Sequence, residues 1–219
     1  MRLTSGIVCG VILLLVPSPP DPAAATRQPE AVLTPVWSIL NEWPETPDGR
    51  GLLPTAVSEA QLATQQAGLA AGSPENLEQM QVHARHVLHA VDPTEMPEGP
   101  GLGYGVRRAS ADVAAQIELA AGAEGASENL RASARQIATL ARNTLARADE
   151  MIALAKAIDG SGSALEAAPL TERLYVLARQ LVSGADANGD GEVGPEPGEG
   201  GLLQIEASIG AMLSGEGLR

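Results

Sequence analysis

The chain of 219 residues is poor in aromatic residues and in cysteine: Phe is absent, Trp and Tyr occur twice each, and Cys9 is the single cysteine. One cysteine cannot form an intramolecular disulfide, and it excludes thiolate metal clusters and haem attachment through a C-x-x-C-H motif. Runs of β-branched or aromatic residues are also scarce, so strands are poorly supported, whereas Ala and Leu favour closely packed helices. The composition predicts an all-α protein.

Positive charge is scarce as well. Lys and Arg number 14 against 27 Asp and Glu, which gives a formal net charge of -13. A surface of this sign repels phosphate backbones and anionic lipid headgroups. Nucleic acid is therefore not expected as a partner, and a protein partner, if there is one, is not named by the sequence.

The one long hydrophobic run lies near the start of the chain. Arg2 precedes the apolar run IVCGVILLLV at residues 7–16, and PSPPDPAAA follows it. Ten apolar residues are too few to span a bilayer as a helix. This layout predicts a secretory signal peptide over residues 1–25 with cleavage after Ala25, an uncleaved membrane anchor being the alternative. Cleavage would leave an exported protein, periplasmic or secreted, without cysteine and without stable membrane insertion.

Two regions follow the signal segment. Residues 26–54 are rich in Pro, Glu, Thr and Gly, and predict a flexible N-terminal segment with one anchored helical turn at PVWSILNEW. Its Trp37 and Trp43 are expected to pack onto the remainder of the protein. Residues 55–219 are expected to form one helical bundle domain.

An internal repeat predicts how that bundle is built. The stretch QAGLAAGSPENL from Gln66 parallels QIELAAGAEGASENL from Gln116, and HARHV from His83 parallels SARQI from Ser133. Each copy, about 58–92 and about 108–158, reads as a helix, a glycine-containing turn and a second helix. A third helical pair is expected over about 166–214. We therefore predict six helices in three hairpins, packed as an antiparallel bundle.

The connection between the two repeats contains alternating glycines, Gly99, Gly101, Gly103 and Gly105. A phosphate-binding loop would need a preceding strand and either the G-x-G-x-x-G or the GK[ST] spacing, so that backbone amides converge on the ligand. Neither is present, and a tight turn is the better interpretation.

An acidic segment, GADANGDGEVGPEPGEGG at residues 184–201, separates the last two predicted helices. Asp186, Asn188 and Asp190 occupy positions 1, 3 and 5 of a possible calcium loop, and Gly191 occupies position 6, where a left-handed bend is required. Glu192 at position 7 would offer its main-chain carbonyl.

This pattern resembles the EF-hand family, over about 35 to 45 residues of the chain. Val193 matches the apolar residue at position 8, but Pro197 stands at position 12, where the family places a bidentate Glu. The resemblance implies a calcium site formed by Asp186, Asn188, Asp190 and the Glu192 carbonyl. We expect Glu196 or Glu199 to supply the closing carboxylate, with weak affinity and a structural role.

All three histidines, His83, His86 and His89, lie in HARHVLHA. Neighbouring pairs share a helical face, but His83 and His89 are about 240° apart around a helix, so all three cannot converge on one ion. A transition-metal site on this helix, or a haem held by His together with Met80 or Met151, is the alternative to the calcium hypothesis.

Residues for catalysis are not evident. There is no G-x-S-x-G motif, and the H-x-x-H-x-x-H spacing lacks the adjacent Glu of zinc hydrolases. We expect an exported, non-enzymatic helical protein with a structural calcium site and a binding or scaffolding role. The alternative is a periplasmic helical-bundle carrier of a transition metal or haem.

Overall fold

The computed structural model describes residues 28–218, which contain seven α-helices and one short 3₁₀ turn. These residues contain no β-strand, only an isolated bridge between Glu42 and Arg50. The predicted signal peptide and Cys9 lie outside the described residues. The elements are α1 (Glu30–Leu40), η2 (Pro47–Gly49), α2 (Leu52–Ala71), α3 (Leu77–Val91), α4 (Val106–Gly122), α5 (Glu128–Asp159), α6 (Ala164–Ser183) and α7 (Leu202–Gly215).

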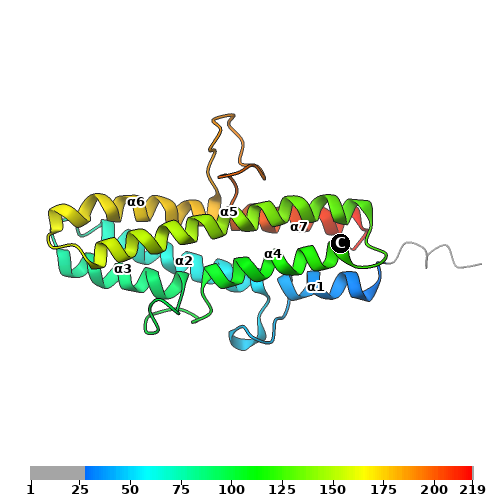
Figure 1. Ribbon diagram of the computed structural model, residues 1–219, viewed down its shortest axis with the longest axis horizontal. Helices are drawn as coiled ribbons and strands as arrows, with labels where there is room; N and C mark the ends of the chain where they lie inside the picture. The colour runs from blue at the N-terminus through cyan, green and yellow to red at the C-terminus, as the bar shows by residue number, and fades with distance from the viewer. Residues whose placement is uncertain (1–27, 219) are drawn as a thin grey trace, which may run out of the picture.

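The helices form an elongated antiparallel bundle with four columns (Figure 1). The first column is α1 followed by α2, the second is α3 followed by α4, the third is α5 alone, and the fourth is α6 followed by α7. Helix α5 packs against α3, α4, α6 and α7, and α2 packs against both α3 and α6, which closes the ring of columns. The predicted all-α bundle is thereby confirmed.

Only the third column is one continuous helix. Helix α5 has 32 residues, which corresponds to about 48 Å at the usual rise per residue, and its sequence contains neither Gly nor Pro. Each of the other columns is interrupted near its middle by a segment rich in Gly and Pro, at residues 41–51, 92–105 and 184–201. Gly and Pro are the poorest helix formers, so these columns break where the residues occur. The three segments leave the bundle near its centre (Figure 1).

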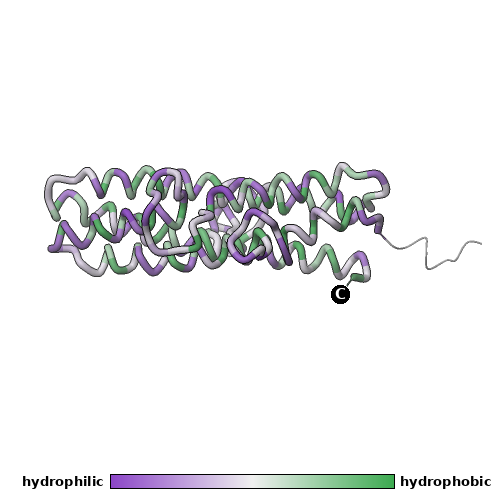
Figure 2. Tube along the Cα trace, turned by 90° about the horizontal axis from the view of Figure 1, so that it is seen from below, coloured by the Kyte–Doolittle hydropathy of each residue, from purple (hydrophilic) through white to green (hydrophobic). Residues whose placement is uncertain are grey.

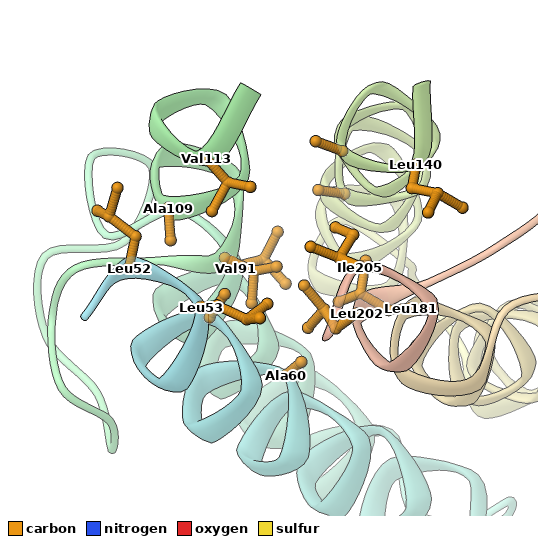
Figure 3. Packing of buried hydrophobic residues seen from close by; sticks show 14 of the residues in the cluster. Leu52, Leu53, Ala60, Val91, Ala109, Val113, Leu140, Leu181, Leu202 and Ile205 are labelled. Carbon is orange, nitrogen blue, oxygen red and sulfur yellow. The ribbon is translucent and has the colours of Figure 1, made fainter. Parts of the chain in front are cut away.

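A single apolar core runs through the bundle and crosses the three interruptions. Side chains from six helices meet at its centre, among them Leu53, Val91, Val113, Leu181 and Ile205 (Figure 3). Most buried positions are Ala, Leu, Val or Ile, which keeps neighbouring helices close in a protein without Phe. Hydrophobic and hydrophilic residues alternate along each helix in the way this arrangement requires (Figure 2).

The expectation of a flexible segment over residues 26–54 is wrong for residues 52–54, which begin α2, and for residues 30–40. Helix α1 has three turns there, and Val32, Val36 and Ile39, spaced four and three apart, are fully buried. This spacing gives one apolar face, which packs against α4 and α2. Trp37 and Trp43 are partly buried against the core, as predicted.

The two predicted repeats are present as helical hairpins, α2 with α3 and α4 with α5. The expectation of a third hairpin is wrong, because α6 and α7 follow one another along the fourth column (Figure 1). The ends of the intervening segment meet at glycines: a Cβ on Gly201 would stand 2.6 Å from the nitrogen of Gly184. The segment therefore leaves and re-enters the column at one place, and α7 continues in the direction of α6.

Candidate cation-binding loop and histidine pair

The acidic loop, residues 184–201, turns its first three predicted ligands inward onto its own backbone. The Asp186 carboxylate accepts hydrogen bonds from the N–H groups of Gly189 (2.6 Å) and Gly191 (2.9 Å). Asn188 Oδ1 accepts from the Asp190 N–H at 2.8 Å, and Asp190 Oδ1 accepts from the Glu192 N–H at 2.8 Å. Each side chain closes a short turn, so the chain winds around its own side-chain oxygens.

Glycine permits this winding. Gly191 has φ +89° and Gly189 has φ +80°, both in the left-handed region that residues with a Cβ rarely adopt. The left-handed bend expected at Gly191 is therefore present. Val193 points inward, with its Cγ1 atom 2.5 Å from the place where a Cβ on Gly184 would stand. Side chains other than hydrogen would not fit at Gly184 without moving Val193.

The two candidate closing carboxylates lie in different surroundings. Glu199 is only 1% exposed, and its two oxygens accept from the N–H groups of Asn188 (3.2 Å) and Gly194 (2.9 Å). Glu196 is exposed, with its carboxylate against Gly194. Glu199 is thus held inside the loop while Glu196 lies at its edge, and Pro197 separates the two residues.

Two polar residues of α5 anchor the loop to the bundle. Asn143 Nδ2 donates to the carbonyls of Glu196 (2.6 Å) and Glu199 (2.7 Å), and its Oδ1 accepts from the Gly198 N–H at 3.1 Å. The Arg147 guanidinium donates to the carbonyls of Gly198, at 2.5 Å, and Gly200.

Both anchoring residues are buried, and burial lowers the pKa of the Arg147 guanidinium. Sequence reasoning missed them. The available signal is a pair of polar residues four apart on the otherwise apolar face of a long helix.

The loop oxygens do not form a compact ligand set as they are placed. Within residues 28–218, no three His, Cys, Asp or Glu side chains stand close enough together to hold a metal ion. Asp186 and Asp190 each direct oxygens toward backbone N–H groups, as does Glu199. Coordination by these residues would require their carboxylate oxygens to turn from the backbone N–H groups toward a common ion.

The histidines divide into a pair and a single residue. His83 Nδ1 and His86 Nδ1 both lie within hydrogen-bond distance of Gln66 Oε1, at 2.8 and 2.9 Å. His89 is buried, and its Nδ1 donates to the carbonyl of Met96 at 2.8 Å. The prediction that the three histidines do not converge is confirmed.

Burial lowers the pKa of His83, and the pKa of His86 is lowered by burial and then by the neighbouring His83, Arg85 and His89. Both side chains therefore favour the neutral form. The sulfur ligands considered for haem, Met80 and Met151, are fully buried in the apolar core.

The glycine-rich segment, residues 92–105, already has a carboxyl group of the protein as the acceptor for two of its backbone N–H groups. Glu59 of α2 is fully buried, and its Oε1 accepts from the N–H groups of Tyr104 (3.1 Å) and Gly105 (3.3 Å). Gly105 is the N-cap of α4 and has no side chain to cap the helix. Glu59, from another helix, fixes the entry into α4 instead, because its Oε1 accepts from the N–H groups of the N-cap residue and of the residue before it.

The fold and the candidate site describe one class of protein. It is an all-α bundle of four columns with an acidic, glycine-rich loop inserted in the fourth column. No protein-family model matches the chain, and neither the curated proteins nor the solved structures include a significant match to it. Of the helices described between residues 28 and 218, none combines the length and apolar character needed to cross a membrane.

Proposed function

We propose that this protein is an exported helical-bundle protein whose acidic loop binds one calcium ion, and that the ion stabilises the junction between α6 and α7. Binding or scaffolding is its role. The observation that carries the proposal is the winding of the loop around the oxygens of Asp186, Asn188 and Asp190, with Gly191 at the left-handed bend. Hard oxygen ligands on a tight turn are what calcium requires.

Charge supports the same conclusion. The loop carries five carboxylates and no Lys or Arg; the carboxylates are those of Asp186, Asp190, Glu192, Glu196 and Glu199. None of them belongs to an ion pair formed within residues 28–218. Arg147, at the base, is directed to backbone carbonyls instead. A divalent cation would relieve the repulsion among these carboxylates.

Of the two candidate closing ligands, Glu199 is favoured. Its carboxylate is buried between the two halves of the loop and contacts the N–H of Asn188, a predicted ligand residue. Glu196 is exposed and has no such contact with the first half of the loop. In this proposal Glu199 takes the role that the residue at position 12 has in an EF-hand, and Pro197 is bypassed.

Calcium titration of the purified protein tests the proposal, by calorimetry and by thermal melting. We expect one ion per chain with a Kd on the order of 10⁻⁴ to 10⁻³ M, as in extracellular modules. At a few millimolar calcium this affinity raises stability by about 1–2 kcal/mol, and Tm by a few degrees. Asp186→Ala combined with Asp190→Ala should abolish both effects.

Matched variants sharpen the test. Glu192→Gln should bind calcium like the wild type, because only its main-chain carbonyl is a proposed ligand. Glu199→Gln should weaken binding more than Glu196→Gln does. Absence of heat and of any Tm shift at several millimolar calcium would contradict the proposal.

A further inference from the structure

A second candidate site lies away from the acidic loop, where α2 and α3 pack together. Three potential ligand atoms converge there: Gln66 Oε1 is 2.8 Å from His83 Nδ1 and 2.9 Å from His86 Nδ1. The two imidazole rings are close, with centroids 5.8 Å apart and planes at 74°. Gln66 comes from α2, and both histidines come from successive turns of α3.

The spacing of these atoms suits a metal ion with right-angled coordination. Nitrogen ligands stand about 2.0–2.1 Å from a first-row divalent ion, so two ligands at a right angle are about 2.9 Å apart. The two observed separations are 2.8 and 2.9 Å. Tetragonal geometry with nitrogen and oxygen ligands is characteristic of Cu²⁺ and Ni²⁺, and Cu²⁺ binds most tightly of the first-row divalent ions.

The surroundings shield the two imidazoles partly from water and place no unpaired cation beside them. Gln66 is 8% exposed and the two histidines are half-buried, so water has only limited access to the site. Burial lowers the pKa of both imidazoles. The Arg85 guanidinium, whose charge helps to lower the pKa of His86, is paired with Asp159 at 2.5 Å.

We propose that His83, His86 and Gln66 form a binding site for one divalent transition-metal ion, with Cu²⁺ preferred. His83 and His86 bind through Nδ1, Gln66 binds through Oε1, and water completes the coordination. Each imidazole then carries its proton on Nε2 in place of Nδ1. The proton moves between the two nitrogens of a neutral ring, so binding near pH 7 releases no net proton.

His89 is excluded from the site and provides the matched control. Its Nδ1 donates to the Met96 carbonyl, and the backbone of Gly99 stands against the ring, since a Cβ on Gly99 would lie 2.6 Å from His89 Cβ. This histidine is on the same helix, but its nitrogen is committed to the glycine-rich segment.

Titration of the purified protein with copper(II) sulfate, followed by electron paramagnetic resonance, tests the site. We expect one Cu²⁺ per chain with hyperfine splitting from two imidazole nitrogens. His83→Gln and His86→Gln should each lower the affinity by more than about tenfold, since loss of a mere supporting partner already costs that much at a metal site. His89→Gln should change it by less than about threefold, and Gln66→Glu, which adds a charged oxygen, should tighten it.

Two results would overturn the assignment. One is the absence of saturable binding in protein whose circular dichroism shows the native helix content. The other is a two-nitrogen signal that persists when His83 and His86 are replaced together. In either case Gln66 is simply a hydrogen-bond acceptor shared by two imidazoles. Asp186→Asn combined with Asp190→Asn should leave copper binding unchanged, which separates this site from the calcium proposal.

Discussion

Two of the three segments that interrupt this bundle, residues 92–105 and 184–201, find hydrogen-bond partners for their backbone groups in opposite ways. In residues 92–105 the N–H groups of Tyr104 and Gly105, just before α4, donate to Glu59, a carboxyl group from another helix. The acidic loop provides its own acceptors, since Asp186, Asn188 and Glu199 receive its N–H groups. In the acidic loop it is the carbonyls that need outside partners, and Asn143 and Arg147 provide them.

The difference indicates which ligands each segment can accept. Backbone amides that converge on an internal carboxylate are no longer free for an external phosphate, so the glycine pattern of residues 92–105 is structural. A loop with surplus carboxylates has the opposite electrostatic character and attracts cations. Each buried partner matches the backbone groups that its segment leaves without a hydrogen bond. Glu59 is an acceptor for N–H groups, and Arg147 is a donor to carbonyls.

The largest expected effect is at Glu59. Glu59→Leu leaves the N–H groups of Tyr104 and Gly105 without an acceptor in the core, where each unsatisfied group costs roughly 1–3 kcal/mol. We expect the free energy of unfolding to fall by about 3–5 kcal/mol in urea denaturation.

A matched control for Glu59 is Glu118→Leu on α4. Glu118 is 53% exposed and pairs with Arg142 on the surface, so its loss should change stability by less than about 1 kcal/mol. Equal effects of the two substitutions would mean that the hydrogen bonds to Glu59 do not stabilise the entry into α4.

Arg147→Met should have the next largest effect. It leaves the carbonyls of Gly198 and Gly200 without their donor and detaches the base of the acidic loop from α5. We expect a loss of about 2–3 kcal/mol and faster amide hydrogen exchange over residues 184–201. Arg142→Met, five residues earlier on α5 and exposed, is the control and should leave exchange in the loop unchanged. Unchanged exchange in Arg147→Met would show that the loop is not anchored there.

The glycines of the acidic loop offer a graded comparison. Gly200 has φ +62°, and a Cβ there would stand 2.1 Å from Leu140 Cδ2, so Gly200→Ala combines backbone strain with overpacking and should cost about 2–3 kcal/mol. Gly191 has φ +89° and open space around it, so Gly191→Ala should cost only about 1 kcal/mol. Thermal melting of the two variants measures the difference, and a larger loss at Gly191 would contradict this account of the loop.

Much of the fold follows from local sequence patterns. The apolar stripe over residues 127–158 predicts α5 almost to its ends, and the repeated helix–turn–helix pattern predicts the two hairpins. Helix α1 was not predicted, because Pro35 and the Pro- and Gly-rich residues around it suggested a flexible segment. The signal for the helix was the apolar face formed by Val32, Val36 and Ile39. The in-line arrangement of α6 and α7 depends on contacts between Gly184 and Gly201, which no periodicity shows.

The candidate sites also contain a part that local sequence predicts and a part that depends on distant contacts. The turn formed by Asp186, Asn188 and Asp190 is local and can be predicted from spacing. Its anchors on α5, and the contact of Gln66 with two histidines, join residues that are 17 to 56 positions apart. Contacts of this kind depend on tertiary packing, so a single sequence does not reveal them.

The smallest expected effect is a pH dependence of stability that arises from the histidine pair. The folded protein lowers the pKa of His83 and His86 below 6.5, so the folded state binds fewer protons than the unfolded state. Stability from this source is complete above the unfolded pKa and is lost as pH falls below it. We therefore expect Tm to decline modestly as pH is lowered from 7 toward 5, and to decline less when His83 and His86 are both replaced by Gln.

Glu216 separates this effect from ordinary acid denaturation. Burial alone would raise the pKa of Glu216, but hydrogen bonds from Ser127, Asn129 and Gln28 outweigh burial and lower it below 4.5. Its contribution is present above pH 4.5 and is lost only as pH falls through the lower, folded value. Glu216→Gln should therefore change the Tm profile below pH 4.5 and leave its slope between pH 7 and 5 intact. A change in that slope would show that the decline does not come from the histidines.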